Sequence, residues 1–536
     1  MKKFLVMLLA FCMIFTFAAC GSEKEVASGD GVVDICIASE PNSIDPALNT
    51  AVDGGMMIQH AFEGLVKWVD DGEGNAVLAP GMAESWDVSE DSLTYTFHLR
   101  EGATWSDGEP VTSDDFMYSW NRLISPETAA DYEYMLDMVE GYADGKLNIS
   151  APDASTFVVK LSAPCPYFEE ICAFPSTYPV RKDMIESAKD QWTFSPETYI
   201  GNGPYNMTEW VHNSYIMYEK NPNYYDADSY TAEKIKFHLM DDANAIYAAY
   251  RNGELDFIED VPQDEIGALL DSGELKLDDY IGTYFVCFQT QRAPFDNPKV
   301  REAFSLAIDR NYIIAQVTGR GEAPAGGFVP AGVHDKQSSD KDFRTVGGDF
   351  YSVDAADYEA NCEKARELLA EAGYPNGEGF PVVEYLYNTN ENHKAVAEAL
   401  QNMWQTELGV TVTLTNQDWS VFLDERKNGN YDIARHGWIA DYNDPMTFID
   451  MWVSTSGSNH AQYNNPEYDA IVKKAKYTTD LDERMDLIHD AEKILMNDSV
   501  VAPIYFYNQP YMINENLKGV YYTPLGFYFF GHTTGM

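Results

Sequence analysis

One segment of the chain, NQDWSVFLDERKNGNYDIARHGWIADYNDP (416–445), concentrates side chains that could bind a ligand carrying charges of both signs. It offers guanidinium groups for an anion, a carboxylate for a cation, and flat indole rings between them. A free peptide has an ammonium group at one end, a carboxylate at the other and a backbone in between. The segment therefore predicts one wall of a peptide-binding site. The side chains concerned are Trp419, Arg426, Arg435, Trp438 and Asp441.

Each of these residues also has a simpler interpretation. Asp441 is one of 86 acidic residues, and a surface carboxylate needs no ligand. Arg435 could hold a structural salt bridge, and a tryptophan such as Trp419 is more often part of a core than of a pocket. The spacing of Arg435, Trp438 and Asp441 along one short stretch favours the binding interpretation.

The elements that must position these side chains follow from apolar periodicity. Strands are predicted over 381–388, 410–416 and 431–438, separated by helices over 395–408 and 420–429. Such alternation is typical of a parallel α/β sheet, whose ligands bind beyond the carboxyl ends of the strands. The segments that follow these strands should therefore converge on one cleft, with the helix between the second and third strands at its rim. They carry His393, Trp419, Arg435, Trp438 and Asp441, and that helix carries Arg426.

The N-terminus is predicted to be a targeting segment. Two lysines precede an apolar run over 4–17 that is too short for a comfortable membrane span and ends in small residues. The sequence FAAC (17–20) is similar to a bacterial lipobox, although leucine usually occupies its first position. We expect a signal peptide over 1–19, a lipid on the thiol of Cys20, and a flexible polar tether over 20–31.

Composition limits the remaining possibilities. A chain of 536 residues is too long for one core, so two or three domains are expected. The formal net charge of −50 disfavours nucleic acid and anionic lipid headgroups as partners. No second apolar run approaches membrane length, and no metal-ligand cluster or hydrolase motif such as GxSxG or HExxH is present. We therefore expect neither a cofactor nor a metal, and no catalytic residues.

Five cysteines follow Cys20, without CxxC spacing, and indicate neither a zinc site nor a disulfide framework. Cys165 and Cys172 could pair, but buried free thiols are the expected state.

Elsewhere, helices are predicted over 57–68 and 113–123, and GNG (201–203) is predicted to be a tight turn rather than a phosphate loop. The aromatic stretch 517–530 is expected to rejoin the first domain.

A resemblance to a known family extends over nearly the whole chain after the predicted signal peptide. It rests on SIDPAL (43–48), FEGL (62–65), AESWDVSED (83–91), PFDNPKVREAFSLAIDR (294–310) and the segment 416–445. With these motifs the chain resembles the oligopeptide-binding proteins of ATP-driven importers, within family 5 of the extracytoplasmic solute-binding proteins. Most of the motifs mark that larger class, which also contains dipeptide, nickel and sugar binders.

The resemblance implies an α/β fold of the periplasmic-binding-protein type, in its large three-domain form (type II). Two lobes would be joined by a hinge and separated by a cleft. The main domain of lobe I would comprise residues 32–62, 190–292 and 508–536. Its extra α+β domain would comprise residues 63–189, and lobe II residues 293–507.

The resemblance also implies roles for individual residues. The aspartate of the family's W-x-A-D-Y-N segment binds the α-ammonium of the ligand, which implies that role for Asp441. Thr50 stands where some relatives carry an acidic residue, so a preference for basic side chains is in doubt. Arginines and a histidine of the family receive the ligand carboxylate, which implies Arg435, Arg426 and His393. Side-chain pockets and backbone contacts are implied for Trp419, Trp438, Gly437 and Tyr132.

The implied function is the capture of oligopeptides between two closing lobes and their delivery to the permease and ATPase subunits of an ABC importer. The protein would be a monomer, held at the outer face of a bacterial cell membrane by the lipid on Cys20. Alternatives on the same scaffold are a binder of dipeptides, cell-wall peptides, signalling peptides, sugars or nickel. A secreted hydrolase is a further alternative of a different class.

Overall fold

The computed structural model describes residues 31–336, 338, 339 and 341–535. The predicted signal peptide, Cys20 and the tether up to residue 30 lie outside the described residues. Within the described part, no helix is both long and apolar enough to cross a membrane. The cysteines at 36, 165, 172, 287 and 362 are all buried and free, so the expected free state of Cys165 and Cys172 is confirmed.

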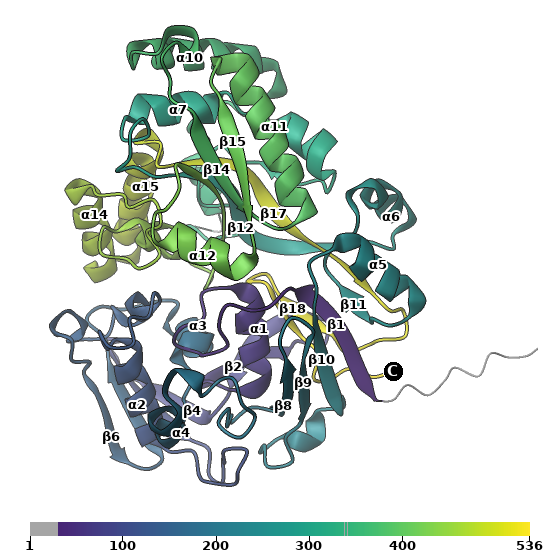
Figure 1. The fold of residues 1–536 in the computed structure, drawn as a ribbon. Coiled ribbons are helices and arrows are strands. Elements are labelled where there is room, and N and C mark those ends of the chain that lie inside the picture. The colour runs from purple at the N-terminus through teal and green to yellow at the C-terminus, as the bar shows by residue number, and fades with distance from the viewer. Residues whose placement is uncertain (1–30, 337, 340, 536) are drawn as a thin grey trace, which may run out of the picture.

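One large mixed sheet of eleven strands extends through both halves of the molecule (Figure 1). Its strands come from the beginning, the middle and the end of the chain, so the sheet ties distant segments together. In spatial order they are β15 (Val412–Gln417), β14 (Val383–Asn388), β16 (Ile433–Ile439), β12 (Lys276–Phe288), β17 (Val501–Ile513), β11 (Phe257–Ile258), β1 (Val32–Ala38), β10 (Lys234–Leu239), β9 (Tyr215–Lys220) and β8 (Tyr205–Val211), and the short β13 (Ala323–Pro324) pairs with β17.

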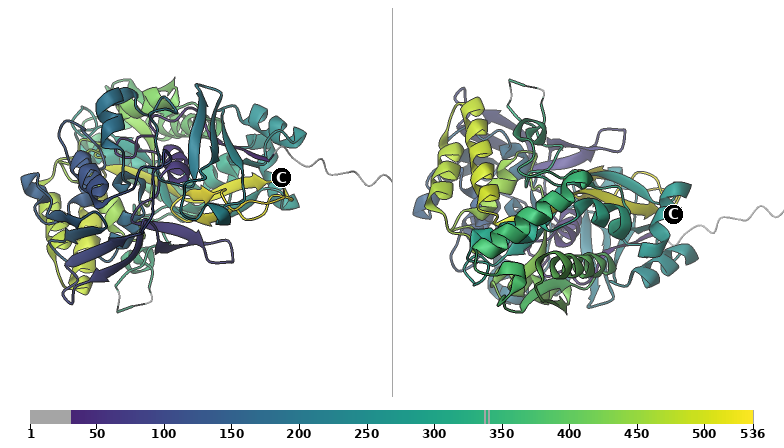
Figure 2. Two further views of the ribbon diagram at one scale, coloured as in Figure 1. Left: turned by 90° about the horizontal axis from the view of Figure 1, so that it is seen from below. Right: turned by 90° about the horizontal axis from the view of Figure 1, so that it is seen from above.

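The predicted parallel α/β unit is confirmed. β14 lies between β15 and β16 and is parallel to both. The connecting helices are α11 (Glu391–Leu408) and α12 (Trp419–Lys427). α11 begins four residues before the predicted start, because the side chain of Asn390 caps it by accepting a hydrogen bond from the backbone N–H of His393 at 3.2 Å. Viewed from above, the helices of residues 358–408 lie over the strands of this lobe (Figure 2).

Two long strands, β12 and β17, cross between the lobes. They are antiparallel over almost their full lengths, from the pair Lys276–Tyr511 to the pair Cys287–Val501. The register shifts between Asp279 and Thr283, near the middle of the crossing. Such an irregularity interrupts the ladder and allows the strands to bend locally, as a hinge between two lobes requires.

A smaller antiparallel sheet occupies the segment predicted to be the extra domain of lobe I. Its order is β4 (Ala83–Val88), β5 (Thr94–Leu99), β7 (Thr156–Lys160) and β6 (Ile149–Asp153). Helix α2 (Ser113–Leu123) packs on β6 and β7 and has the predicted bounds. Both of its Thr112–Asp115 capping-box bonds are present. The domain boundaries themselves remain a prediction.

The helix predicted over 57–68 is wrong in its position. Helix α1 is Val52–Ala61, and the chain then becomes extended at Phe62 and enters strand β2 (Val66–Asp70). Asn202 in the GNG sequence forms hydrogen bonds with the backbone N–H and carbonyl of Glu63, which would otherwise continue the helix. The side chain of Asn202 accepts from the N–H of Glu63 at 3.0 Å and donates to its carbonyl at 2.9 Å. These tertiary bonds override the apolar periodicity.

The aromatic C-terminal stretch rejoins the first domain as expected. It forms the strands β18 (Tyr521–Thr523) and β19 (Phe527–Phe529). β19 packs against α1, and Tyr522 forms an isolated bridge with Asn75 in the hairpin of β2 and β3 (Ala76–Pro80).

Two aspartates in the recognised motifs form buried ion pairs. Asp45 of SIDPAL receives both terminal nitrogens of Arg122, at 2.9 and 2.6 Å, and the indole N–H of Trp192 at 2.9 Å. Asp444 of the YNDP sequence receives both terminal nitrogens of Arg484, at 2.9 and 2.7 Å. Such bidentate pairs satisfy both charges internally. These motif residues therefore hold the scaffold together and have no free oxygen for a ligand.

Candidate functional site

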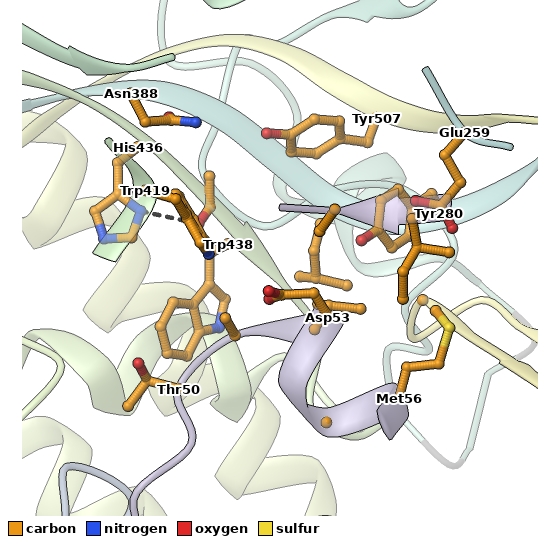
Figure 3. A pocket seen from close by; sticks show the side chains of 18 of the residues that line it. Thr50, Asp53, Met56, Glu259, Tyr280, Asn388, Trp419, His436, Trp438 and Tyr507 are labelled. Carbon is orange, nitrogen blue, oxygen red and sulfur yellow. Dashed lines mark hydrogen bonds between the residues drawn. The ribbon is translucent and has the colours of Figure 1, made fainter. Parts of the chain in front are cut away.

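A cavity of about 340 Å³ lies between the lobes, and all eight residues predicted for the site line it. It is formed by β16, the N-terminal end of α11, one face of α12, the first turn of α1, and parts of β12 and β17. Figure 3 shows Trp419, Trp438 and His436 along one side of it. The eight residues brought together are Tyr132, His393, Trp419, Arg426, Arg435, Gly437, Trp438 and Asp441.

Asp441 follows β16 and is buried without a cationic partner among the described residues. Its Oδ1 accepts a hydrogen bond from the hydroxyl of Tyr132 at 3.0 Å, and its Oδ2 accepts one from Thr447 at 3.3 Å. Burial raises the pKa of this carboxyl group well above its ordinary value. A carboxylate in this state gains much from a cation, and a ligand ammonium group would supply one.

Two buried arginines face the same cavity without an anion. Arg435 lies within β16, and its Nε has no hydrogen-bond partner. Its guanidinium lies 5.5 Å from the ring centroid of Tyr284 and 5.9 Å from that of Trp419. The Nε of Arg426 donates to Nδ1 of His460 at 3.2 Å. Burial and the nearby charge of Arg435 lower the pKa of Arg426 to about 9.

A third arginine, Arg320, also lines the cavity, and its Nε has no hydrogen-bond partner. In the described part of the chain, none of these three guanidinium groups forms an ion pair with a carboxylate. Arginine forks suit carboxylates, which they can bind through two parallel hydrogen bonds. The arrangement can therefore receive an anionic group of a ligand.

His393 lies in the first turn of α11 and faces the arginines. Its Nδ1 is 3.4 Å from the hydroxyl of Tyr284. Its pKa is held well below the ordinary value, because the ring is buried and because Arg435 and Arg320 repel a further positive charge. The imidazole is therefore neutral, and an anion bound beside it would favour its protonation.

Rings from both lobes close the cavity. Tyr132 comes from the smaller domain, and its ring centroid lies 6.3 Å from that of Trp438. The indole N–H of Trp438 is buried without a partner. Gly437 is required for close packing, since a Cβ at that position would collide with the hydroxyl of Tyr507. Tyr507 therefore reaches into the cavity over the strand (Figure 3).

Several acidic and tyrosine side chains of the cavity were missed by the sequence reasoning. Thr50 lines the cavity, as its position in the motif suggested, but an acidic residue is present three positions later, Asp53. It was overlooked because the helix was predicted to begin at residue 57, whereas Asp53 lies in the first turn of α1. Glu259 directly follows β11, and its place at the end of a strand was the available clue. Tyr280 lies beside it (Figure 3).

A mixed α/β fold of two lobes, joined by crossing strands and with a charge-lined cavity between them, defines a solute-binding protein. The chain belongs to the bacterial extracellular solute-binding proteins, family 5, whose model matches residues 77–460. This is a family of binding proteins and not of enzymes.

Individual relatives match over nearly the whole chain. The dipeptide-binding protein DppE of Bacillus subtilis is 35% identical, over 94% of this chain and 92% of the relative. A crystal structure of Haemophilus influenzae OppA in complex with RPPGFSPFR is 33% identical, covers 94% of this chain and 98% of that one, and has a TM-score of 0.86.

Two structures of the Escherichia coli murein tripeptide-binding protein MppA differ in how closely they match the present structure. One has a TM-score of 0.84, at 34% identity over 92% of this chain and 96% of that one. The unliganded open form, at the same identity over 93% and 95%, has a TM-score of only 0.59. The difference shows that the lobes of MppA are hinged. The lobes of the present structure are arranged as in the first MppA structure and not as in the open form.

Proposed function

We propose that this protein captures short peptides outside the cytoplasm and delivers them to the membrane subunits of an ABC importer. The observation that carries the proposal is the placement of opposite unpaired charges within β16 and just beyond its end. Among the residues that the structure describes, Asp441 forms no ion pair with a cation and Arg435 forms none with an anion, and both line one cavity. Arg435 lies within β16 and Asp441 lies two residues beyond its end, so six residues at about 3.3 Å each set an upper limit of about 20 Å on the distance between their Cα atoms. A zwitterion with well-separated charges fits this spacing better than a sugar or a metal ion.

The names of the relatives support a peptide as the ligand. They describe dipeptide-, oligopeptide- and murein-tripeptide-binding proteins, and one crystal structure contains a bound peptide. A further solved relative, from Borrelia burgdorferi, is described as part of an oligopeptide ABC transporter. The proposed roles are those implied by the family: Asp441 for the ammonium, Arg435, Arg426 and His393 for the carboxylate, and Trp419, Trp438, Gly437 and Tyr132 for pockets and backbone.

Anchoring of the protein at the outer face of the cell membrane is a part of the proposal that rests on the lipobox-like sequence alone. Labelling cells with a radioactive fatty acid should mark the wild-type protein and not the Cys20→Ala variant. Equal labelling of the two would remove the anchor from the proposal and leave the binding function untouched.

Calorimetry with one tripeptide and its blocked forms tests the binding function. We expect trialanine to bind, its N-acetylated and C-amidated forms to bind much more weakly, and a disaccharide not to bind. Mass spectrometry of the natively purified protein should find intact peptides bound to it. Binding that is indifferent to both terminal blocks would overturn the proposal, and so would cleavage of the peptide during incubation.

Replacing Arg435 by Met should weaken binding of a peptide with a free carboxylate by about 10- to 100-fold, as expected for the loss of one charge-assisted contact. The C-amidated peptide should lose much less. Arg426 and His393 remain available as partial substitutes, so the loss should be smaller than at Asp441. Equal losses for the acid and the amide would show that Arg435 does not contact the carboxylate.

The affinity for a free-ammonium peptide should increase as the pH rises above about 4 and through the raised pKa of the Asp441 carboxyl group. The pKa of the Asp441 carboxyl group is raised by burial, so at acidic pH it is protonated and binds a cation poorly. Buried Asp450 lies nearby with its pKa raised to about 6, and Lys476 is its cation. Asp441→Asn should flatten the profile.

The raised pKa of Asp441 has the opposite effect on the stability of the ligand-free protein, which should decrease as the pH rises. A carboxyl group whose folded pKa is raised stabilises the fold at low pH, and this contribution is lost as the pH rises from about 4 through the folded value. Denaturation of ligand-free protein at several pH values would detect it. The contribution from Asp441 would be refuted if Asp441→Asn left the pH dependence of both affinity and stability unchanged.

A further inference from the structure

Two buried histidines, His436 and His460, line the cavity beside Arg426, and the proposed function does not use them. Nδ1 of His436 lies 2.8 Å from the carbonyl oxygen of Gly437 (Figure 3), and its Nε2 lies 3.0 Å from Nδ1 of His460. The same Nδ1 of His460 accepts a hydrogen bond from Nε of Arg426 at 3.2 Å. These three contacts form a continuous network from Gly437 through both rings to Arg426.

The rings of His436 and His460 direct these two nitrogens at each other. Their centroids are 5.2 Å apart, which is close to the 3.0 Å between the nitrogens plus the radii of the two rings, and their planes differ by only 22°. The two nitrogens therefore lie on the line between the centroids. Because the lone pair of an imidazole nitrogen lies in the ring plane and points outward, this contact needs a proton between the two atoms.

Two neutral rings are one proton short of satisfying the network. A neutral imidazole carries a single N–H, and that of His436 is used at Nδ1 by the carbonyl of Gly437. Its Nε2 then presents a lone pair to Nδ1 of His460, which must keep its own lone pair to accept from Arg426. A proton placed on Nδ1 of His460 instead would face the N–H of Arg426, which stays protonated at neutral pH. Only a second proton on His436 satisfies all three contacts.

Positive charge opposes this second proton in the ligand-free protein. Burial and the charge of Arg426 hold the pKa of both rings well below its ordinary value. Arg435 adds to the effect on the pKa of His436, and Lys427 adds to the effect on that of His460. The empty site therefore contains two neutral imidazoles and an unsatisfied contact between them.

The other side chains packed against the rings carry no charge. The ring of Phe285 stacks on that of His436 with the centroids 4.7 Å apart. The hydroxyl of Tyr431 donates to the carbonyl of His460 at 2.6 Å and lies 3.3 Å from the thiol of Cys287. Burial raises the pKa of both Tyr431 and Cys287, so both are neutral. Among the described residues, neither ring forms an ion pair with a carboxylate, so the ligand must supply the negative charge.

The donors left over at this cluster can bind such an anion. Within the described part of the chain, the terminal nitrogens of Arg426 form no hydrogen bond, and Nε2 of His460, which carries the proton of that ring, forms none either. Arg426 and His460 both line the cavity, so a ligand carboxylate can bind these donors. Its negative charge would then lie beside the two rings and stabilise a second proton on His436.

We propose that His436 and His460 hold between them a proton that the protein takes up from solvent when a carboxylate of the peptide binds Arg426. This inference rests on the proposed function and adds its regulation by pH. The proton enters at Nε2 of His436 and returns to solvent when the peptide leaves. The affinity for a carboxylate at this position therefore increases as the pH falls, by up to about tenfold per pH unit for one proton.

The proton uptake is measured by titration calorimetry in buffers of different ionisation enthalpy. The probes are alanine peptides from dialanine to pentaalanine and tripeptides with glutamate at each position in turn. Loss of affinity in Arg426→Met identifies the probes whose carboxylate reaches Arg426. Replacing the terminal carboxylate by an amide, or glutamate by glutamine, then shows whether that carboxylate belongs to the C-terminus or to a side chain.

With such a probe at about pH 6, the wild type should take up about 0.5 to 1 proton more than His436→Gln. The amide N–H of glutamine provides the missing donor to His460 without a charge. Asp441 and His393 are present in both proteins, so protons that they release or take up cancel in the difference. The carboxylate-free form of the probe should show no difference between the two proteins.

Two further variants make the test independent of one substitution. His212 is exposed and lies outside the cavity, so His212→Gln should take up as many protons as the wild type. In His460→Asn the amide can donate to His436 and accept from Arg426, so this variant should lose the same uptake as His436→Gln. It replaces His436→Gln if that protein does not fold.

Each outcome decides the inference. Equal proton uptake by the wild type and His436→Gln, with a probe that depends on Arg426, overturns it and leaves peptide capture intact. The same conclusion follows if no probe depends on Arg426, or if the wild type takes up equal numbers of protons with the probe and with its carboxylate-free form. Failure of every peptide to bind wild-type protein overturns the proposed function and the inference together.

Discussion

Asp441→Asn should weaken the binding of a peptide with a free N-terminus by about 2–5 kcal/mol, the cost of truncating one partner of a buried, hydrogen-bonded charge pair. The carboxylate is buried, and its two hydrogen bonds, from Tyr132 and Thr447, are both neutral. A ligand ammonium would be the only full positive charge to reach it. An asparagine keeps the shape and one acceptor but brings no charge.

Titration calorimetry of the wild type and the variant with the same tripeptide measures the difference, and the N-acetylated tripeptide is the control. Acetylation removes the ammonium charge, so the variant and the wild type should bind the acetylated form about equally weakly. A loss below about 0.5 kcal/mol for the free peptide would show that Asp441 is not the receptor of the ammonium group.

Asp444→Asn, three residues away, should instead lower the free energy of unfolding by about 3–5 kcal/mol, because breaking a buried ion pair leaves the remaining charge uncompensated. Arg484 is buried, and both of its terminal nitrogens donate to Asp444 at 2.7–2.9 Å. The guanidinium also lies 5.4 Å from the ring centroid of Tyr167. An asparagine can accept only one of the two bonds and carries no charge.

Urea denaturation followed by circular dichroism measures this change, and Asp441→Asn is the matched comparison. The same substitution on the same loop should alter stability at position 444 and affinity at position 441. An unfolding midpoint of Asp444→Asn equal to that of the wild type would mean that the pair with Arg484 contributes nothing to the fold. The two variants together separate scaffold residues from ligand residues within one motif.

The sequence was sufficient for the three parallel strands of lobe II and for most of the cavity wall along them. Alternation of strands and helices specifies a parallel sheet, and a parallel sheet specifies the edge at which its loops converge. That reasoning located Trp419 and Asp441 without any knowledge of tertiary contacts. It worked because periodicity and local capping agree with the fold throughout this region.

The cavity wall formed by α1 and the residues after β11 could not be predicted from the sequence in this way. Its position depends on tertiary bonds between residues far apart in sequence, such as those from Asn202 to Glu63 just after the end of α1. Asp53 therefore enters the cavity from a segment that lies before the predicted start of the helix at residue 57. Glu259 follows a strand of only two residues, which is too short to show any period.

The order of the central sheet also bears on the synthesis of the protein. β17 lies between β12 and β11, so the strand that joins the two lobes is among the last to leave the ribosome. Until then β11 lacks its antiparallel neighbour, and β12 is paired on only one side. Long-range pairings of this kind form slowly. A chain that completes its sheet only near its end stays unfolded for longer, which suits a polypeptide that must be threaded through a membrane before it folds.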